Sequence, residues 1–189
     1  MSEFIVDLHV HSKYSRACSK ALELPAIAKA GEQKGISIVV TGDFTHPRWF
    51  EHLTDALVED RAGIYRLKNN PSPTRFVIGT EVACIYKHAG AVRRVHLLLF
   101  APTLEVAGKI NQALAERGCN LKADGRPILG ISAKDLLKLM LDIDERCVMI
   151  PAHAWTPWFA VFGSKSGYNS LEECFEELTQ RIHAIETGL

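Results

Sequence analysis

The residues best suited to chemistry stand near the N-terminus, where Asp7, His9 and His11 alternate with apolar side chains in residues 4–12. In a strand, successive side chains point to opposite faces, so these three project together. Neutral imidazole nitrogens bind zinc, manganese or iron, and Asp7 is placed to hold one ring by its second nitrogen. The motif indicates a metal site, with two surface histidines on a strand as the alternative.

Four more candidate ligands occur at or near the ends of later strand-like runs. Asp43, Glu81 and His153 stand at or just after such ends, and His96 lies inside a run. Taken singly, each has an ordinary explanation as a paired carboxylate, a core histidine or a turn residue. In α/β barrels, however, strand ends bring distant residues into one pocket. Histidines and carboxylates that meet there suit a site of two or three metals, which activates water to attack a phosphoester.

Strand-like and helix-like segments alternate along most of the chain, which predicts an α/β fold. Short β-branched runs indicate the strands, and apolar residues at helical spacing indicate the helices. The expected strands are residues 4–12, 36–41, 74–86, 91–100, 147–152 and 181–186, and the expected helices are 22–34, 49–65, 104–117, 132–141 and 171–178. Residues 87–90 predict a hairpin turn. Because there is no linker or internal repeat, residues 1–189 predict a single domain.

Composition limits the classes of protein that the chain can represent. Its 189 residues are 47% hydrophobic, which excludes disordered and fibrous classes. The formal net charge is zero, so any nucleic acid or membrane must be met by a local patch. Five scattered cysteines lack C-x-x-C pairing. Together with the absence of a signal peptide or a long apolar run, they predict reduced thiols and a cytoplasmic location.

Five short motifs resemble those of the PHP (polymerase and histidinol phosphatase) superfamily, in the same order along the whole chain. They are D-x-H-x-H-S at 7–12, T-G-D at 41–43, G-T-E at 79–81, H-L-L at 96–98 and P-A-H at 151–153. The resemblance implies a distorted (β/α)7 barrel that hydrolyses phosphoesters. It also implies two or three divalent metal ions, either zinc, manganese or iron, with magnesium also compatible.

Carried over by position, the resemblance assigns individual ligands. It gives His9, His11 and Glu81 to a first metal, and Glu81, His96 and His153 to a second. Asp43 stands where the family usually has a histidine ligand of a third metal. The residues expected to act in catalysis are His9, His11, Asp43, Glu81 and His153.

Two features of the family pattern are missing. Residues 17–19, about six positions after the second histidine, are Ala, Cys and Ser instead of a further ligand, and no D-x-H motif follows His153. The expected strands are also fewer than seven. We therefore expect residues 1–189 to be the N-terminal part of a longer protein, with a barrel that lacks its C-terminal strand or strands.

Within the superfamily, residues 41–47 and 153–178 resemble endonuclease Q. That resemblance implies a DNA-repair enzyme that nicks DNA on the 5′ side of deaminated bases such as uracil and hypoxanthine. The expected substrate contacts are aromatic residues for stacking and cations for phosphate: Trp155, Trp158, Phe159, Arg16, Lys20 and Lys165. The aromatic residues could equally pack a lid or core. A small-molecule phosphatase of histidinol-phosphatase type and an inactive metal-binding fragment are the alternative functions.

Overall fold

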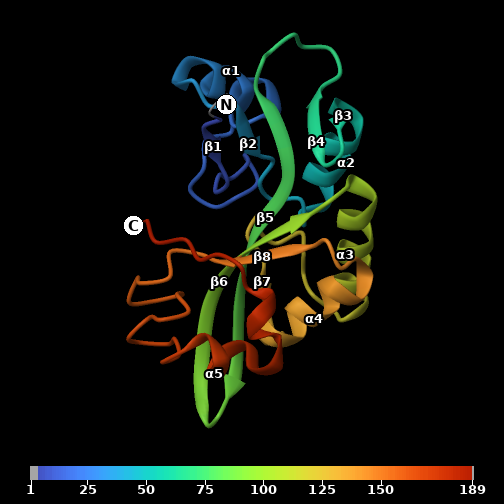
Figure 1. The fold of residues 1–189 in the computed structure, drawn as a ribbon. Coiled ribbons are helices and arrows are strands. Elements are labelled where there is room, and N and C mark those ends of the chain that lie inside the picture. The colour runs from blue at the N-terminus through green and yellow to red at the C-terminus, as the bar shows by residue number, and fades with distance from the viewer. Residues whose placement is uncertain (1–3, 189) are drawn as a thin grey trace.

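One long strand, β5 (Arg75–His88), organises the fold, which is known from a computed structural model that describes residues 4–188. The first part of β5 pairs in parallel with β2 (Ile38–Val40) and antiparallel with β4 (Ile64–Leu67). Its second part pairs antiparallel with β6 (Ala91–Ala101) and in parallel with β7 (Ile128–Leu129). The strand therefore links two parts of the sheet (Figure 1). The expected hairpin between β5 and β6 is confirmed.

The remaining strands lie at the margins of the sheet. β1 (Val6–Asp7) pairs with β2, β3 (Leu57–Arg61) with β4, and β8 (Val148–Pro151) with β6. Within residues 4–188, β1 has β2 as its only neighbour and β8 has only β6, so no strand closes the sheet between them. In the described part of the chain, the eight-stranded sheet is thus open and does not close into the expected barrel. The expected mixed α/β fold is confirmed.

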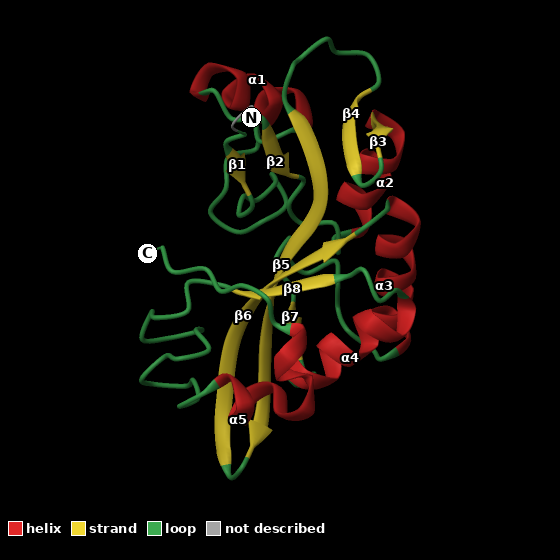
Figure 2. Ribbon diagram, viewed as in Figure 1, coloured by secondary structure: helices red, strands yellow, loops and turns green. Residues whose placement is uncertain are grey.

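The helices are short and lie beside the sheet (Figure 2). They are α1 (Leu24–Lys34), α2 (Pro47–Ala56), α3 (Leu104–Glu116), α4 (Ala133–Ile143) and α5 (Leu171–Phe175), which a 3-10 helix (Glu176–Arg181) follows. The side chains of Thr103, Ser132 and Ser170 accept hydrogen bonds from free backbone N–H groups at the starts of α3, α4 and α5. In the described part of the chain, no helix has the length and apolar character needed to cross a bilayer.

The helix expected over residues 49–65 is only partly correct. α2 ends at Ala56, and the chain turns into the β3–β4 hairpin. In the hairpin, Leu57, Tyr65 and Leu67 are buried, with Tyr65 and Leu67 two positions apart on one face of β4. Gly63 makes the hairpin turn possible, because its φ of 75° lies in the left-handed region.

The strand expected over residues 181–186 is wrong. Residues 176–181 form a 3-10 helix, and residues 182–188 have no regular secondary structure. Within residues 182–188, the backbone hydrogen bonds to β8 and the residues after it centre on Glu186: its N–H donates to the carbonyl of Pro151, and Ala154 N–H donates to the carbonyl of Glu186. Two hydrogen bonds around one residue fix that residue in place without forming a strand.

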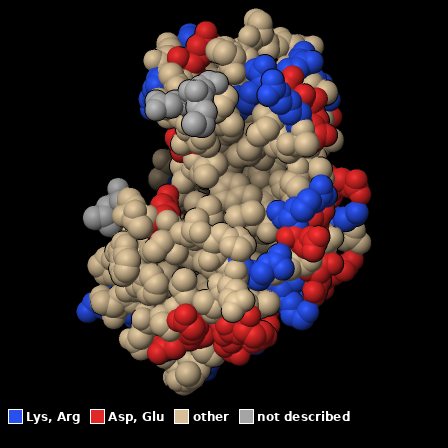
Figure 3. All heavy atoms as spheres, viewed as in Figure 1, with Lys and Arg blue, Asp and Glu red and all other residues tan. Residues whose placement is uncertain are grey.

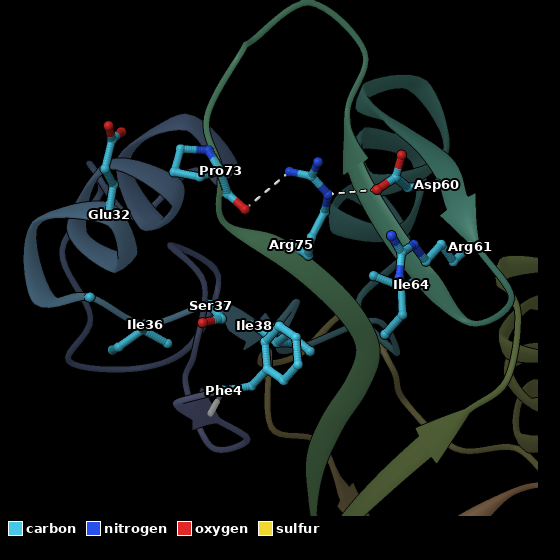
Figure 4. A pocket seen from close by; sticks show the side chains of 11 residues that line it. Phe4, Glu32, Ile36, Ser37, Ile38, Asp60, Arg61, Ile64, Pro73 and Arg75 are labelled. Atoms are coloured by element: carbon cyan, nitrogen blue, oxygen red, sulfur yellow. Dashed lines mark hydrogen bonds and ion pairs between the residues drawn. The ribbon is translucent and has the colours of Figure 1, made fainter. Parts of the chain in front are cut away.

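The amino ends of the parallel strands border a cavity, and the candidate ligands lie away from it. A cavity of about 540 Å³ lies at the amino ends, bordered by Phe4, Ile38, Ile64, Pro73 and Arg75 among others (Figure 4). On the surface, the face in Figure 3 is hollowed at its centre, where uncharged residues predominate, while positive and negative residues are mixed around it. His9, His11 and His153 lie instead beyond the carboxyl ends of β1 and β8, the usual position of active sites in α/β folds, while Glu81 and His96 lie within β5 and β6.

Candidate metal centre

Glu81 is the centre of the site. It lies on β5 with 1% of its side chain exposed, and four histidines surround its carboxylate. Oε2 is 3.3 Å from His9 Nε2 and 3.0 Å from His11 Nε2. Oε1 is 2.7 Å from His96 Nδ1 and 3.3 Å from His153 Nε2. One buried carboxylate thus presents each of its oxygens to a different pair of imidazoles.

Four different parts of the sheet supply these side chains. His9 and His11 follow β1, Glu81 lies on β5, His96 on β6, and His153 directly follows β8. They form two groups whose ligand atoms lie within 4.8 Å of one another: His9, His11 and Glu81, and Glu81, His96 and His153. Imidazole nitrogens with a shared carboxylate suit zinc, manganese and iron, so the donor set fits two divalent ions.

A second layer of residues orients the histidine rings. Asp43 is fully buried, and its Oδ1 accepts from His11 Nδ1 at 2.9 Å. Glu186 does the same for His9, whose Nδ1 lies 2.9 and 3.1 Å from the two carboxylate oxygens. Oε2 of Glu186 also accepts from the backbone N–H of His153 at 2.6 Å. With their Nδ1 protons directed outward, His9 and His11 turn their Nε2 atoms toward Glu81.

Asp7 and Asp43 do not make the contacts that the sequence predicted for them. Asp7 accepts from the backbone N–H of His9 at 3.2 Å, and the ring nitrogen goes to Glu186. Asp43 belongs to neither ligand group. Besides His11, it accepts hydrogen bonds from Ser12 N–H, Ser12 Oγ and Ser15 Oγ, at 2.7, 2.7 and 2.9 Å. A metal at Asp43 would compete with all of these donors.

Backbone strain accompanies two of the site residues. Asp43 and His153 have φ values of 49° and 30°, in a region that residues other than glycine rarely adopt. Asp43 follows Gly42, whose φ is 64° and where an added Cβ would lie 2.5 Å from the carbonyl oxygen of Val10. The close approach of these two loops brings Asp43 beneath His11.

Burial and neighbouring charges shift the pKa values of the site residues in opposite directions. Burial disfavours ionisation of Glu81, but the hydrogen bonds from the four histidines outweigh it and hold the pKa of this carboxyl well below its usual range. Burial disfavours protonation of His11, yet Asp43 and Glu81 raise its pKa to about 9. The pKa of His9 is raised in the same way, against burial, by Glu81 and Glu186. For His96 burial prevails, and its pKa is lowered.

These shifts predict that metal binding by His9 and His11 releases protons. His11, with a pKa of about 9, is protonated at pH 7.5 and must lose a proton to bind a metal. Affinity should therefore rise with pH up to about 9, by roughly tenfold per unit for one released proton. Isothermal titration of zinc in two buffers with different ionisation enthalpies measures the proton count. Equal heats in both buffers at pH 7.5 would contradict the prediction.

Glu186 gives a prediction about ring orientation. In Glu186→Gln, one amide oxygen replaces a charged acceptor that serves both His9 Nδ1 and the His153 N–H. We expect metal affinity to fall by about 10- to 100-fold, the usual effect of losing such a partner. Competition with a chelator measures this, and Glu172→Gln, at an exposed position on α5, is the matched control. Equal affinities in the two variants would exclude an orienting role for Glu186.

The residues expected to contact substrate lie in loops near the centre. Trp155 and Trp158 are 56% and 52% exposed. Trp155 stacks on Phe162 with ring centroids 4.7 Å apart, and the guanidinium of Arg94 lies 5.9 Å from the Trp158 ring centroid. Phe159 is half-buried and packs against His96 at 4.6 Å. The two tryptophans therefore present free ring surface to solvent.

The expected cations differ in position. Arg16, Lys20 and Lys165 are all exposed. Arg16 borders a pocket that His96 also lines, whereas Lys20 Nζ lies 3.5 Å from the backbone carbonyl of Lys13. Lys165 stands in the loop of the exposed tryptophans, and its N–H donates to the carbonyl of Pro157. Of the three, Arg16 has the most direct structural link to the metal ligands.

Two residues of the site were not expected from the sequence. Glu186 is the last residue of the segment expected to be a strand, so its position at a strand end was an available signal. Arg126, whose Nη1 lies 3.1 Å from Glu81 Oε2, stands in a polar connection with no local pattern around it. Only the tertiary structure reveals its proximity to Glu81.

Comparison with known proteins shows that the structure of the chain is similar to that of a nuclease, endonuclease Q. No protein-family model matches the chain. The structure is similar to that of the lesion-specific endonuclease PfuEndoQ from Pyrococcus furiosus, with 29% identity and a TM-score of 0.80 over 97% of the chain. It is equally similar, at 30% identity and TM-score 0.80, to an endonuclease Q crystallised with a 27-mer duplex substrate with an abasic lesion at the active site.

A sequence relative is an uncharacterized protein of Methanocaldococcus jannaschii, 28% identical over 152 residues that make up 80% of the chain. The chain spans 42% of the length of each endonuclease Q structure and 16% of this relative. The expected resemblance to endonuclease Q is confirmed, and it extends over nearly the whole chain.

Proposed function

We propose that this chain carries the metal centre of a metal-dependent endonuclease, which nicks DNA on the 5′ side of deaminated bases such as uracil and hypoxanthine. The observation that carries the proposal is the convergence of four histidines on the buried carboxylate of Glu81: His9 and His11 after β1, His96 on β6 and His153 after β8. The structural similarity to a lesion-specific endonuclease supports a phosphodiester in DNA as the substrate.

The residues of the chain have distinct parts in this proposal. His9, His11 and Glu81 hold one divalent ion, and Glu81, His96 and His153 hold the other. Bound there, the ions supply a Lewis acid for the phosphate and lower the pKa of the attacking water. Asp43 and Glu186 keep the histidine rings in the tautomer that binds metal. Trp155 and Trp158 offer exposed rings on which unpaired bases can stack.

Metal removal tests the proposed activity. The substrates are 5′-labelled duplexes that contain a single uracil, hypoxanthine or abasic site, and an undamaged duplex is the control. We expect a nick on the 5′ side of the lesion with manganese or zinc, no nick after chelation, and recovery when metal is restored. Turnover of a phosphomonoester alone would favour a small-molecule phosphatase. Bound metal with neither activity would favour a metal-binding fragment.

The cytoplasmic location also belongs to the proposal. All five cysteines are free, and three of them, Cys84, Cys147 and Cys174, are buried. Free thiols are the usual state of cysteine in a reducing compartment, where a repair enzyme would meet DNA.

A further inference from the structure

Arg126 places a cation at the edge of the metal centre. It lies in the loop before β7, and its Nη1 is 3.1 Å from Oε2 of Glu81, the oxygen that also faces His9 and His11. Its side chain is 39% exposed. Among residues 4–188, no other nitrogen of the guanidinium has a hydrogen-bond partner. Its remaining donors are therefore free for a ligand that approaches Glu81.

A pocket of about 440 Å³ opens beside this guanidinium. Its lining includes Arg126, Arg16, Asn120, His96 and Phe159. Because His96 is also a candidate ligand, the pocket borders the metal centre. Two arginines from loops far apart in the sequence thus border one cavity, and a single anion between them would be attracted by both.

The loops that carry the two arginines are fixed to each other by Asp124. Its carboxylate accepts from the backbone N–H of Arg126 at 2.9 Å and from the backbone N–H of Arg16 at 3.3 Å. Gly125 lets the same loop lie against Asp43, the residue that orients His11. A side chain at position 125 would not fit, because its Cβ would lie 2.3 Å from Asp43 Oδ2. The hydrogen bonds of Asp124 and the close contact at Gly125 therefore fix the position of the Arg126 backbone.

We propose that Arg126, assisted by Arg16, binds the phosphate group of the substrate strand beside the metal centre. This inference rests on the proposed phosphoesterase function and names the residues that hold its substrate. The planar guanidinium can donate two parallel hydrogen bonds to phosphate oxygens. It also offsets the negative charge of Glu81, which would otherwise repel a phosphate at close range.

Binding of inorganic phosphate tests this subsite without relying on catalysis. Metal-loaded protein, dialysed free of excess metal, is titrated with phosphate by calorimetry at pH 7.5. We expect Arg126→Ala to weaken binding by about tenfold or more, as the loss of a charge-assisted hydrogen bond does. Arg126→Lys should recover part of the affinity, because it keeps the charge but not the paired donors. Arg16→Ala should lose less.

Controls separate the subsite from other effects. Arg117→Ala, an exposed arginine at the end of α3, should bind phosphate as the wild type does. The metal content of every variant is measured in parallel and should be unchanged. The inference is overturned if the wild type binds no phosphate, if Arg126→Ala binds it normally, or if Arg126→Ala loses metal in proportion. Phosphate binding that depends on Arg126, in a protein that nicks no DNA, would count against the proposed nuclease and leave the subsite supported.

Discussion

Replacing Glu81 with Gln should remove both metal sites at once. The two oxygens of this carboxylate face different histidine pairs, so one substitution changes the ligand that both ions share. The neutral amide keeps the shape but offers one oxygen and turns an N–H donor toward the other pair of imidazoles. A metal present at 100 times its dissociation constant stabilises a one-site protein by about 2.7 kcal/mol. For a domain of this size, that corresponds to a rise in melting temperature of roughly 5–10 °C.

Thermal unfolding with and without zinc or manganese measures the loss, and elemental analysis after dialysis counts the ions. The matched control is Glu105→Gln on α3, where an exposed glutamate pairs with Lys109 across one helical turn. Glu105→Gln should keep the full metal-induced rise, whereas Glu81→Gln should show none. A Glu81→Gln protein that retains two ions per chain would show that the carboxylate is not their common ligand.

The sequence predicted which candidate ligands meet better than it predicted the framework around them. His9, His11 and His153 could be recognised because imidazoles at the ends of apolar runs are conspicuous, and strand ends converge in α/β folds. The carboxylate between them, Glu81, was found for the same reason. His96 lies inside its run and was recognised from the H-L-L motif. Local sequence therefore carried the information on which residues meet, since each ligand lies within a strand or in the loop that follows it.

The supporting partners could not be assigned in the same way. Glu186 reaches His9 across 177 positions of the chain, and Arg126 reaches Glu81 across 45. These contacts depend on how β1, β7 and β8 are placed. For Glu186 the only local signal was its position at the end of an expected strand, and for Arg126 there was none. Asp7 was given an orienting role because it is two residues from His9, yet Glu186 makes that contact. Proximity in sequence was a poor guide to the second layer.

The secondary-structure predictions that were wrong lie where tertiary packing decided against the structure that the local sequence favoured. Apolar residues at helical spacing suggested one helix over residues 49–65, but the β3–β4 hairpin buries Leu57 and Tyr65 against the sheet. The strand expected over residues 181–186 had suitable residues, but only Glu186 reaches the sheet to form hydrogen bonds. In both places, intrinsic propensity was similar for two structures, and packing against β5 and β8 decided between them.

Replacing His9 and His11 together with Ala should remove one ion and leave the other. These two rings face Oε2 of Glu81, whereas His96 and His153 face Oε1. The second site should survive, because Glu186 still accepts from the His153 N–H at 2.6 Å after the His9 ring is gone. His96→Ala with His153→Ala should give the converse result. Elemental analysis of the dialysed proteins counts the ions, and a duplex with one uracil measures nicking.

Both double variants should lose nicking, by more than the roughly 10- to 100-fold that the loss of an orienting partner causes, because they remove ligands themselves. They should differ in the pH dependence of zinc binding. The raised pKa values belong to His9 and His11, so the protein without them should bind its remaining ion with fewer protons released at pH 7.5. Unchanged metal content in His9→Ala/His11→Ala would refute the first site. Loss of both ions would show that Glu81 cannot hold the second ion without the first, and the two sites would then be a single cooperative centre.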